Sequence, residues 1–325
     1  MCIRDSRYSA IFGLSSPLSG LKNFAIGSNM AIGVYGMRAY MHGISQTFNP
    51  VSAIRKKNWE RVRRQGGLEE GTKELELRSW EKKVSNTVSQ MGTTEAVNRV
   101  FSSFAAEYNA RQMIRVMQGK ESIMGVGKQK FMPENLKKLF NLSKDEVAFL
   151  NRFGLDDAGL TLYNITGKRK KIYQQEQDRL LAKIHHYGHI KAQGSSGDPY
   201  LPLWAGSGKA KALTLFYRMA YSGTANIYNH IVSPAKQGNF LPMFRHLVAG
   251  NVAGSALWSV YTWAFSQEPP KVNEDDFDIL AQNLAKTEAL GLFSFLVNPY
   301  KKGCLLYTSD AADEGLGVDL GGRRI

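Results

Sequence analysis

The spacing of hydrophobic residues along this chain predicts helices. Between residues 97 and 117, apolar side chains recur every three or four positions. This spacing places them on one face of an α-helix that ends near Gly119. A second helix should begin after Ser143 and stop at Gly154, because Ser143 and Glu146 have the spacing of a capping box. No stretch shows the sustained period-two alternation that marks a strand. We therefore predict an all-α fold.

Two further helix starts are marked by proline and by acidic residues. Pro133 opens the run PENLKKLF, and proline is favoured in the first turn of a helix. Residues 273–276 (NEDD) place acidic side chains in the first turn of a helix that runs toward Val297. With the glycine-rich apolar stretches, these segments predict an irregular multi-helix bundle. The bundle is extended or incomplete if the chain is a fragment.

The most apolar predicted helix lies in the last third of the chain. Residues 246–265 contain no Asp, Glu, Lys or Arg, and this length matches a membrane span. Gly250 and Gly254 form a G-x-x-x-G face suited to close helix packing, and Tyr261 and Trp263 are residue types typical of a membrane interface. Interspersed polar residues fit a buried core helix as well. A membrane span and a core helix therefore both stay open.

Composition divides the chain into three segments between two unusual ends. Residues 7–50 are rich in glycine and methionine, residues 51–192 are charged and helical, and residues 193–303 are hydrophobic and begin with a glycine-serine loop. The formal net charge is +14. A balance this basic favours an anionic partner, which can be nucleic acid, acidic lipid or an acidic protein.

The two ends differ in character from the chain between them. Residues 1–6 (MCIRDS) and residues 304–325 (CLLYTSDAADEG and onward) resemble a translated sequencing-library adapter. We therefore expect both ends to be adapter artefacts and residues 7–303 to be an internal fragment of a longer reading frame. Both cysteines, Cys2 and Cys304, lie in these ends, so the fragment supplies no disulfide, thiolate metal site or cysteine nucleophile. It is also more basic than +14, because the ends hold more acidic than basic residues.

Two basic clusters, each with an aromatic neighbour, are candidate sites of anion or nucleic-acid contact. Lysine and arginine bind phosphates and release counterions, and the flanking rings of Trp59 and Tyr173 could stack on bases. The alternative interpretation is a solvated helix face, and anionic membrane lipid is an alternative partner. The first cluster comprises Arg55, Lys56, Lys57, Arg61, Arg63 and Arg64, and the second comprises Lys168, Arg169, Lys170 and Lys171.

A pair of histidines is the candidate for metal binding. His185 and His189 are spaced one helical turn apart, like the two zinc ligands of H-E-x-x-H hydrolases. Here His186 replaces the catalytic glutamate, and Gly188 weakens the helix. Surface histidines on a basic helix are the alternative interpretation. We predict no metal site, no cofactor and no enzymatic activity for this segment.

Four short stretches carry a resemblance to a known family. They are SPLSGLKN (residues 16–23), LPLWAG (201–206), LTLFYR (213–218) and VSPAK (232–236). These stretches resemble parts of the large polyvalent proteins of tailed bacteriophages, which are multi-domain proteins packaged in the virion and delivered with the genome. The resemblance implies a location in the virion and then in the envelope or cytoplasm of the host. It implies other segments of the parent protein, or other virion proteins, as partners.

Three functions remain to be compared. The resemblance implies a non-enzymatic helical segment that packs with other helices or associates with the host envelope during genome delivery. The first alternative is a nucleic-acid-binding module that uses the basic clusters at 55–64 and 168–171. The second alternative is a metal-dependent enzyme fragment around His185 and His189.

Overall fold

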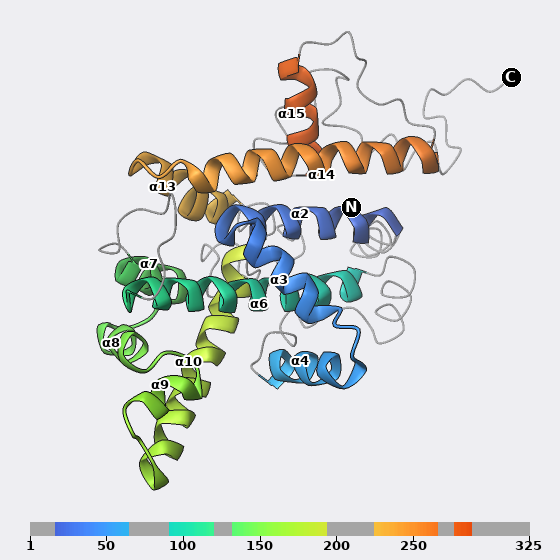
Figure 1. Cartoon of the computed structure of the whole chain (residues 1–325). Helices are drawn as coiled ribbons and strands as arrows, with labels where there is room; N and C mark the ends of the chain where they lie inside the picture. Colours follow the sequence, from blue (N-terminus) through green and yellow to red (C-terminus); the bar gives the residue numbers. More distant parts are fainter. Residues whose placement is uncertain (1–16, 65–90, 120–131, 194–223, 266–275, 288–325) are drawn as a thin grey trace, which may run out of the picture.

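The computed structural model describes an assembly of helices in which α2 (Pro17–Tyr35) lies between two longer helices. Every element within the described residues is a helix, which confirms the predicted all-α class. The two longer helices are α6 (Met91–Met117) and α14 (Leu241–Phe265), and α2 contacts both of them (Figure 1). The helices of the three predicted segments therefore contact one another. The described residues are 17–64, 91–119, 132–193, 224–265 and 276–287.

Some of the sequence predictions fall outside these residues. They concern the two adapter-like ends, the loop after residue 193, and two of the four phage-like stretches. The ends are residues 1–6 and 304–325. The loop residues are 194–199, and the two stretches are 201–206 and 213–218.

The chain turns a corner between α2 and α3 (Met37–Thr47) at a single residue, Gly36. Its φ of +90° lies in the region that favours glycine. Beyond this corner α3 crosses α6 at very short range. A side chain at Gly43 would overlap the backbone carbonyl oxygen of Phe101. Gly43 is therefore the residue that lets the two helix backbones approach.

Replacing Gly43 with alanine should lower the free energy of unfolding by about 1–3 kcal/mol, the usual cost of overpacking a core. Alanine favours the helical state by about 1 kcal/mol relative to glycine, so a net loss must come from the contact with Phe101. Urea denaturation followed by circular dichroism measures the change. Ser45→Ala, on an exposed position of the same helix, is the control. Equal midpoints for the two variants would contradict the close approach.

Helix α6 carries the apolar stripe that the sequence predicts. Phe101, Phe104 and Ile114 are buried, and the helix ends at Met117, before Gly119 with its positive φ. This confirms the predicted helix and its end.

Helix α10 (Gly167–Gln193) crosses α6 and continues through Gly188 without a break (Figure 1). A side chain at Gly188 would overlap the Cβ atom of Ala106. The glycine that weakens α10 as an isolated helix thus permits its contact with α6.

In the described part of the connection between α6 and α10, residues 132–166, there are three short helices. The middle one, α8 (Lys144–Phe153), has the predicted capping box: the backbone N–H of Glu146 donates to Ser143 Oγ at 3.2 Å, and the backbone N–H of Ser143 donates to Glu146 Oε2 at 2.7 Å. It ends before Gly154, where φ is +69°. Both predicted ends of α8 are therefore confirmed. The other two helices are α7 (Met132–Phe140), with Pro133 in its first turn, and α9 (Asp157–Leu162).

Helix α14 packs against α2 on one side and against α15 (Asp276–Lys286) on another (Figure 1). At Gly254 a side chain would overlap the backbone of Asn283. The Asn283 side chain donates to Asn251 Oδ1 at 2.7 Å and to Ser255 Oγ at 3.0 Å. The polar residues that interrupt the apolar run of α14 therefore hold α15 in place.

Helix α15 begins at Asp276, and its predicted continuation toward Val297 lies outside the described residues beyond Thr287. Within residues 228–240, two small elements precede α14. They are η4 (Tyr228–Val232), a single π-helical turn, and α13 (Ser233–Lys236). Within the described ranges, no helix has both the length and the apolarity that crossing a bilayer requires.

Candidate anion-binding site

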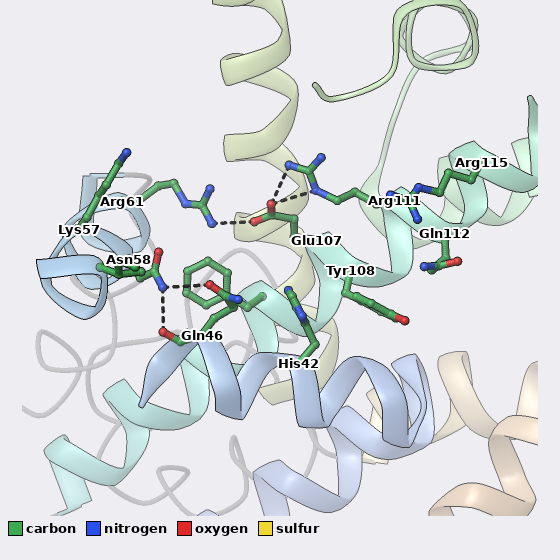
Figure 2. A pocket seen from close by; sticks show the side chains of 12 residues that line it. His42, Gln46, Lys57, Asn58, Arg61, Glu107, Tyr108, Arg111, Gln112 and Arg115 are labelled. Carbon is green, nitrogen blue, oxygen red and sulfur yellow. Dashed lines mark hydrogen bonds and ion pairs between the residues drawn. The ribbon is translucent and has the colours of Figure 1, made fainter. Parts of the chain in front are cut away.

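A pocket of about 510 Å³ lies between α3, α4 (Ser52–Arg64) and α6 (Figure 2). Among the described residues that line it, four carry cationic side chains and one carries a carboxylate. The excess of positive charge marks it as a candidate site for an anion. The cations are Lys57 and Arg61 from α4 with Arg111 and Arg115 from α6, and the carboxylate is Glu107 of α6.

Side-chain hydrogen bonds to the end of α3 hold α4 at the pocket. Asn58 Nδ2 donates to the backbone oxygen of Gln46 at 2.8 Å and to its Oε1 at 3.1 Å. Trp59 Nε1 donates to the backbone oxygen of Thr47 at 3.1 Å. Carbonyls in the last turn of a helix lack partners within it, so these two side chains satisfy them. The same contacts orient α4 so that Arg61 faces α6.

Glu107 is the centre of a buried polar cluster. Its Oε2 accepts from Arg61 Nη2 at 2.9 Å and from His185 Nε2 at 2.8 Å. Its Oε1 accepts from Arg111 Nε at 3.0 Å and Nη2 at 2.9 Å. Figure 2 shows the two arginines approaching the carboxylate from opposite sides. The guanidinium of Arg61 also lies over the ring of Phe104, 4.9 Å from its centre.

The ionisation states in this cluster follow from burial and charge. Burial alone raises the pKa of Glu107, but the hydrogen bond from His185 and the charges around it, including Arg61 and Arg111, outweigh burial and lower the pKa to about 2. Burial lowers the pKa of His185 despite the nearby carboxylate. At neutral pH a neutral His185 therefore donates from Nε2 to an ionised Glu107. Its Nδ1 is buried and has no hydrogen-bond partner among the described residues.

Among the described residues that line the pocket, four cationic side chains stand against the single carboxylate of Glu107. Glu107 neutralises one charge, and Asp156 forms an ion pair with Arg111. Lys57 and Arg115 are exposed at the same pocket. Guanidinium and ammonium groups bind phosphate oxygens through charge-assisted hydrogen bonds. The arrangement is therefore suited to binding a phosphate group.

The structure divides the first predicted basic cluster between this pocket and the exposed surface of α4. Arg61 turns inward to Glu107, whereas Arg55, Lys56, Lys57 and Arg63 are exposed. The side chain of Arg64 lies outside the described atoms. The predicted stacking partner, Trp59, instead packs against a small core of Val62, Val100 and Phe104.

The second predicted cluster lies elsewhere. Lys168–Lys171 occupies the first turn of α10, about 21–26 Å along the helix axis from His185. The ring of Tyr173 stacks on Phe149 with centroids 5.7 Å apart and meets the edge of Phe153. The structure therefore does not join the two clusters into one site, and both predicted stacking rings pack within the protein.

The histidine pair is buried rather than arranged around an ion. His185 is 1% exposed and His189 is 2% exposed. His185 binds Glu107, and His189 Nδ1 lies 3.2 Å from the backbone oxygen of His185. In the part of the chain that the structure describes, no group of three or more His, Cys, Asp or Glu side chains is placed to hold a metal ion.

The residues predicted for membrane contact or helix packing have different positions. Gly250 is buried, and its carbonyl oxygen lies 3.5 Å from Thr287 Oγ1, just beyond α15. Gly254 contacts α15 directly, as described above. Trp263 is 87% exposed, and the Tyr261 side chain is outside the described atoms.

Sequence reasoning missed the residues at the centre of the pocket. Glu107 and Arg111 have the spacing of an ion pair on one helix face, and this spacing is a readable signal. Nothing local to them indicates that Arg61 and His185 meet the same carboxylate.

Fold and pocket together define a class of protein, an all-α protein with a basic pocket on its surface. Comparison of the chain with models of protein families, with curated proteins and with solved structures finds no match. Its function must therefore be argued from its own residues.

Proposed function

We propose that this chain is a non-enzymatic helical segment of a phage virion protein that binds the phosphate backbone of nucleic acid through α4 and the adjoining pocket. The observation that carries this proposal is the convergence of Lys57, Arg61, Arg111 and Arg115 on one pocket. The resemblance to large polyvalent proteins supports the phage setting, with the virion and then the host cell as location. A protein delivered with a genome has nucleic acid beside it throughout delivery.

The geometry favours contact with phosphates over contact with bases. Trp59 and Tyr173, the rings predicted to stack on bases, pack against other side chains of the protein. Exposed lysine and arginine on one helix supply charge without a pattern of donors and acceptors that could read sequence. Contacts of this kind give binding that is independent of sequence and falls steeply with salt.

A fourfold substitution on α4 tests the proposal. Arg55→Gln, Lys56→Gln, Lys57→Gln and Arg63→Gln together remove four exposed positive charges of α4. Binding to a 20-base-pair DNA duplex is then measured by fluorescence anisotropy across a salt series. We expect at least about tenfold weaker binding at 0.1 M salt. The slope of log affinity against log salt should fall by about 0.9 for each phosphate that the variant no longer neutralises.

The second basic cluster supplies a matched control. Lys168→Gln, Arg169→Gln, Lys170→Gln and Lys171→Gln remove the same charge from the first turn of α10. This variant should keep the affinity within about threefold, because Debye screening over about 10 Å at 0.1 M salt isolates α10's first turn from the pocket. Equal losses in the two variants would show diffuse attraction to a basic protein. Absence of binding by the unmodified chain would overturn the proposal.

Association with the host envelope stays a prediction, and one feature favours it. Phe244, Val248 and Val252 form an exposed apolar row at four-residue spacing on α14, and Trp263 is exposed near its end. Such a row could contact a membrane surface without crossing it. Co-sedimentation with phosphatidylglycerol vesicles tests this second function.

A further inference from the structure

A second cavity, apolar where the first is basic, runs along the contact between α2 and α14. Its volume is about 520 Å³, within the range of small-molecule sites. Leu21, Phe24 and Ile32 line it from α2, and Val248 and Val252 line it from α14. Val252 is 64% exposed, so in the described part of the chain this apolar groove is open to solvent. A contiguous exposed apolar surface of this kind is typical of a binding site.

One charged side chain, Arg245, lies in the lining of this groove. Its guanidinium rests on Gly36, with Nη1 2.9 Å from the position that a Cβ atom of Gly36 would occupy. Burial lowers the pKa of Arg245, and no carboxylate of the described residues pairs with it. A half-buried cation in apolar surroundings is unfavourable until an anion meets it. The groove therefore presents an unsatisfied positive charge.

A buried amide supplies a second and independent sign of a missing ligand. Asn29 lines the same groove and is 1% exposed, yet neither its Nδ2 nor its Oδ1 has a hydrogen-bond partner among the described residues. Buried polar groups are paired in the great majority of folded proteins. A polar atom of a ligand lying in the groove would restore a partner to Asn29.

The shape of the groove favours a thin chain over a helix. Gly36 meets Arg245 and Gly33 meets His246, so Arg245 lies at one end of the groove and Val260 lies about 22 Å away along α14. A single acyl chain reaches about 15 Å, half the hydrocarbon core of a bilayer. One turn of a helix with its side chains fills about 400 Å³, so a docked helix would be held by little more than one turn.

We propose that this groove binds a free long-chain fatty acid, with its carboxylate at Arg245 and its acyl chain along α2 and α14 toward Val260. The charge of Arg245 selects an anionic head, and the apolar walls select a hydrocarbon tail. This site is separate from the basic pocket and does not depend on the nucleic-acid proposal.

Calorimetric titration of the full chain with oleate below its critical micelle concentration tests the proposal. We expect one oleate per chain. Arg245→Gln should weaken oleate binding at least about tenfold, because a hydrogen bond to a charged group is removed. Arg245→Lys should retain part of the affinity, since it keeps the charge. Arg169→Gln, which removes an exposed arginine far from the groove, should bind oleate as the unmodified chain does.

Two further arms keep the test decisive if Arg245→Gln does not fold. Ala253→Phe places a large side chain in the groove, whose lining includes Ala253, and should abolish oleate binding while leaving the far-ultraviolet circular dichroism unchanged. Methyl oleate has the same chain without the charge. On the unmodified protein it should bind at least about tenfold more weakly than oleate, for the same reason as Arg245→Gln.

Three outcomes would overturn the proposal. Several oleates bound per chain would show detergent-like adsorption. Equal affinity for oleate and methyl oleate would remove the role of Arg245. Binding to phosphatidylglycerol vesicles without binding to monomeric oleate would identify the groove as a membrane-contact surface.

Discussion

Replacing Glu107 with alanine should lower the free energy of unfolding by about 3–5 kcal/mol, the usual cost of removing one partner from a buried ion pair. The carboxylate is the shared acceptor for Arg61, Arg111 and His185. Without it, two guanidinium groups face each other across a site that is closed to water on the side of His185. Urea denaturation at pH 7, followed by circular dichroism at 222 nm, measures the loss.

Two further variants separate the contribution of Glu107 from general effects of charge. Asp156→Ala removes the other carboxylate that pairs with Arg111, but the Asp156 side chain is 61% exposed. Its loss should therefore cost no more than about 1 kcal/mol. Glu107→Gln keeps the shape of the side chain and one acceptor oxygen. Its loss of unfolding free energy should lie between those of Glu107→Ala and Asp156→Ala. A Glu107→Ala variant as stable as Asp156→Ala would show that the cluster does not support the fold.

Acidification from pH 6 to pH 4 should destabilise the fold steeply. Burial is the largest cause that lowers the pKa of His189 to about 3 and that of His230 to about 4, and burial also lowers the pKa of His185. In the unfolded chain these histidines titrate near pH 6.5. At a pH between the folded-state and unfolded-state pKa values, the unfolded chain binds protons that the folded chain does not. The free energy of unfolding therefore falls as pH falls.

His189 and His230 should each contribute about 1.4 kcal/mol per pH unit within this window, or about 3 kcal/mol per unit together, and His185 adds to the loss in the same direction. Below pH 4.5 the depressed pKa of Glu107 adds to the loss in the same direction, because the unfolded carboxylate binds its proton first. Urea denaturation at pH 7, 6, 5 and 4 gives the free energy of unfolding at each pH, and these values give the slope.

Single substitutions assign the slope to particular histidines. His189→Gln and His230→Gln should each make the pH dependence shallower by about 1.4 kcal/mol per unit. His186→Gln, a partly exposed histidine on the same helix as His189, is the matched control. A flat dependence between pH 7 and 5 in the unmodified chain would contradict the buried neutral state of these side chains.

The fold class was predictable because its signals are local. The capping box at Ser143 and Glu146 spans four residues, and the stripe on α6 repeats within a single helix. Backbone geometry alone converts such patterns into helix starts and buried faces. The all-α class, the C-terminal end of α6 and both ends of α8 therefore needed no knowledge of tertiary contacts.

The centre of the pocket was not predictable, because its signals are distant in the chain. Glu107 meets Arg61 at a separation of 46 residues and His185 at a separation of 78. Neither spacing carries a periodicity that could be read in advance. The role of Trp59 was also hidden, since an aromatic ring within a basic run fits base stacking and core packing equally well.

Glycines illustrate the same limit in a different way. The sequence shows that Gly188 weakens its helix and that Gly254 suits close helix packing, but not which neighbour each one admits. Ala106 and Asn283 occupy those positions, and both are far away in the chain. The helix-packing face at Gly250 and Gly254 was readable as a type of contact, whereas its partner, α15, was not.

Gly36 connects the two cavities through one position. Its backbone conformation sets the angle between α2 and α3, and its lack of a side chain gives Arg245 its place at the end of the groove. Helix α3 in turn carries His42 and Gln46 to the basic pocket. A substitution at this position would alter the corner and displace the arginine at once. The geometry of both cavities therefore depends on this one residue.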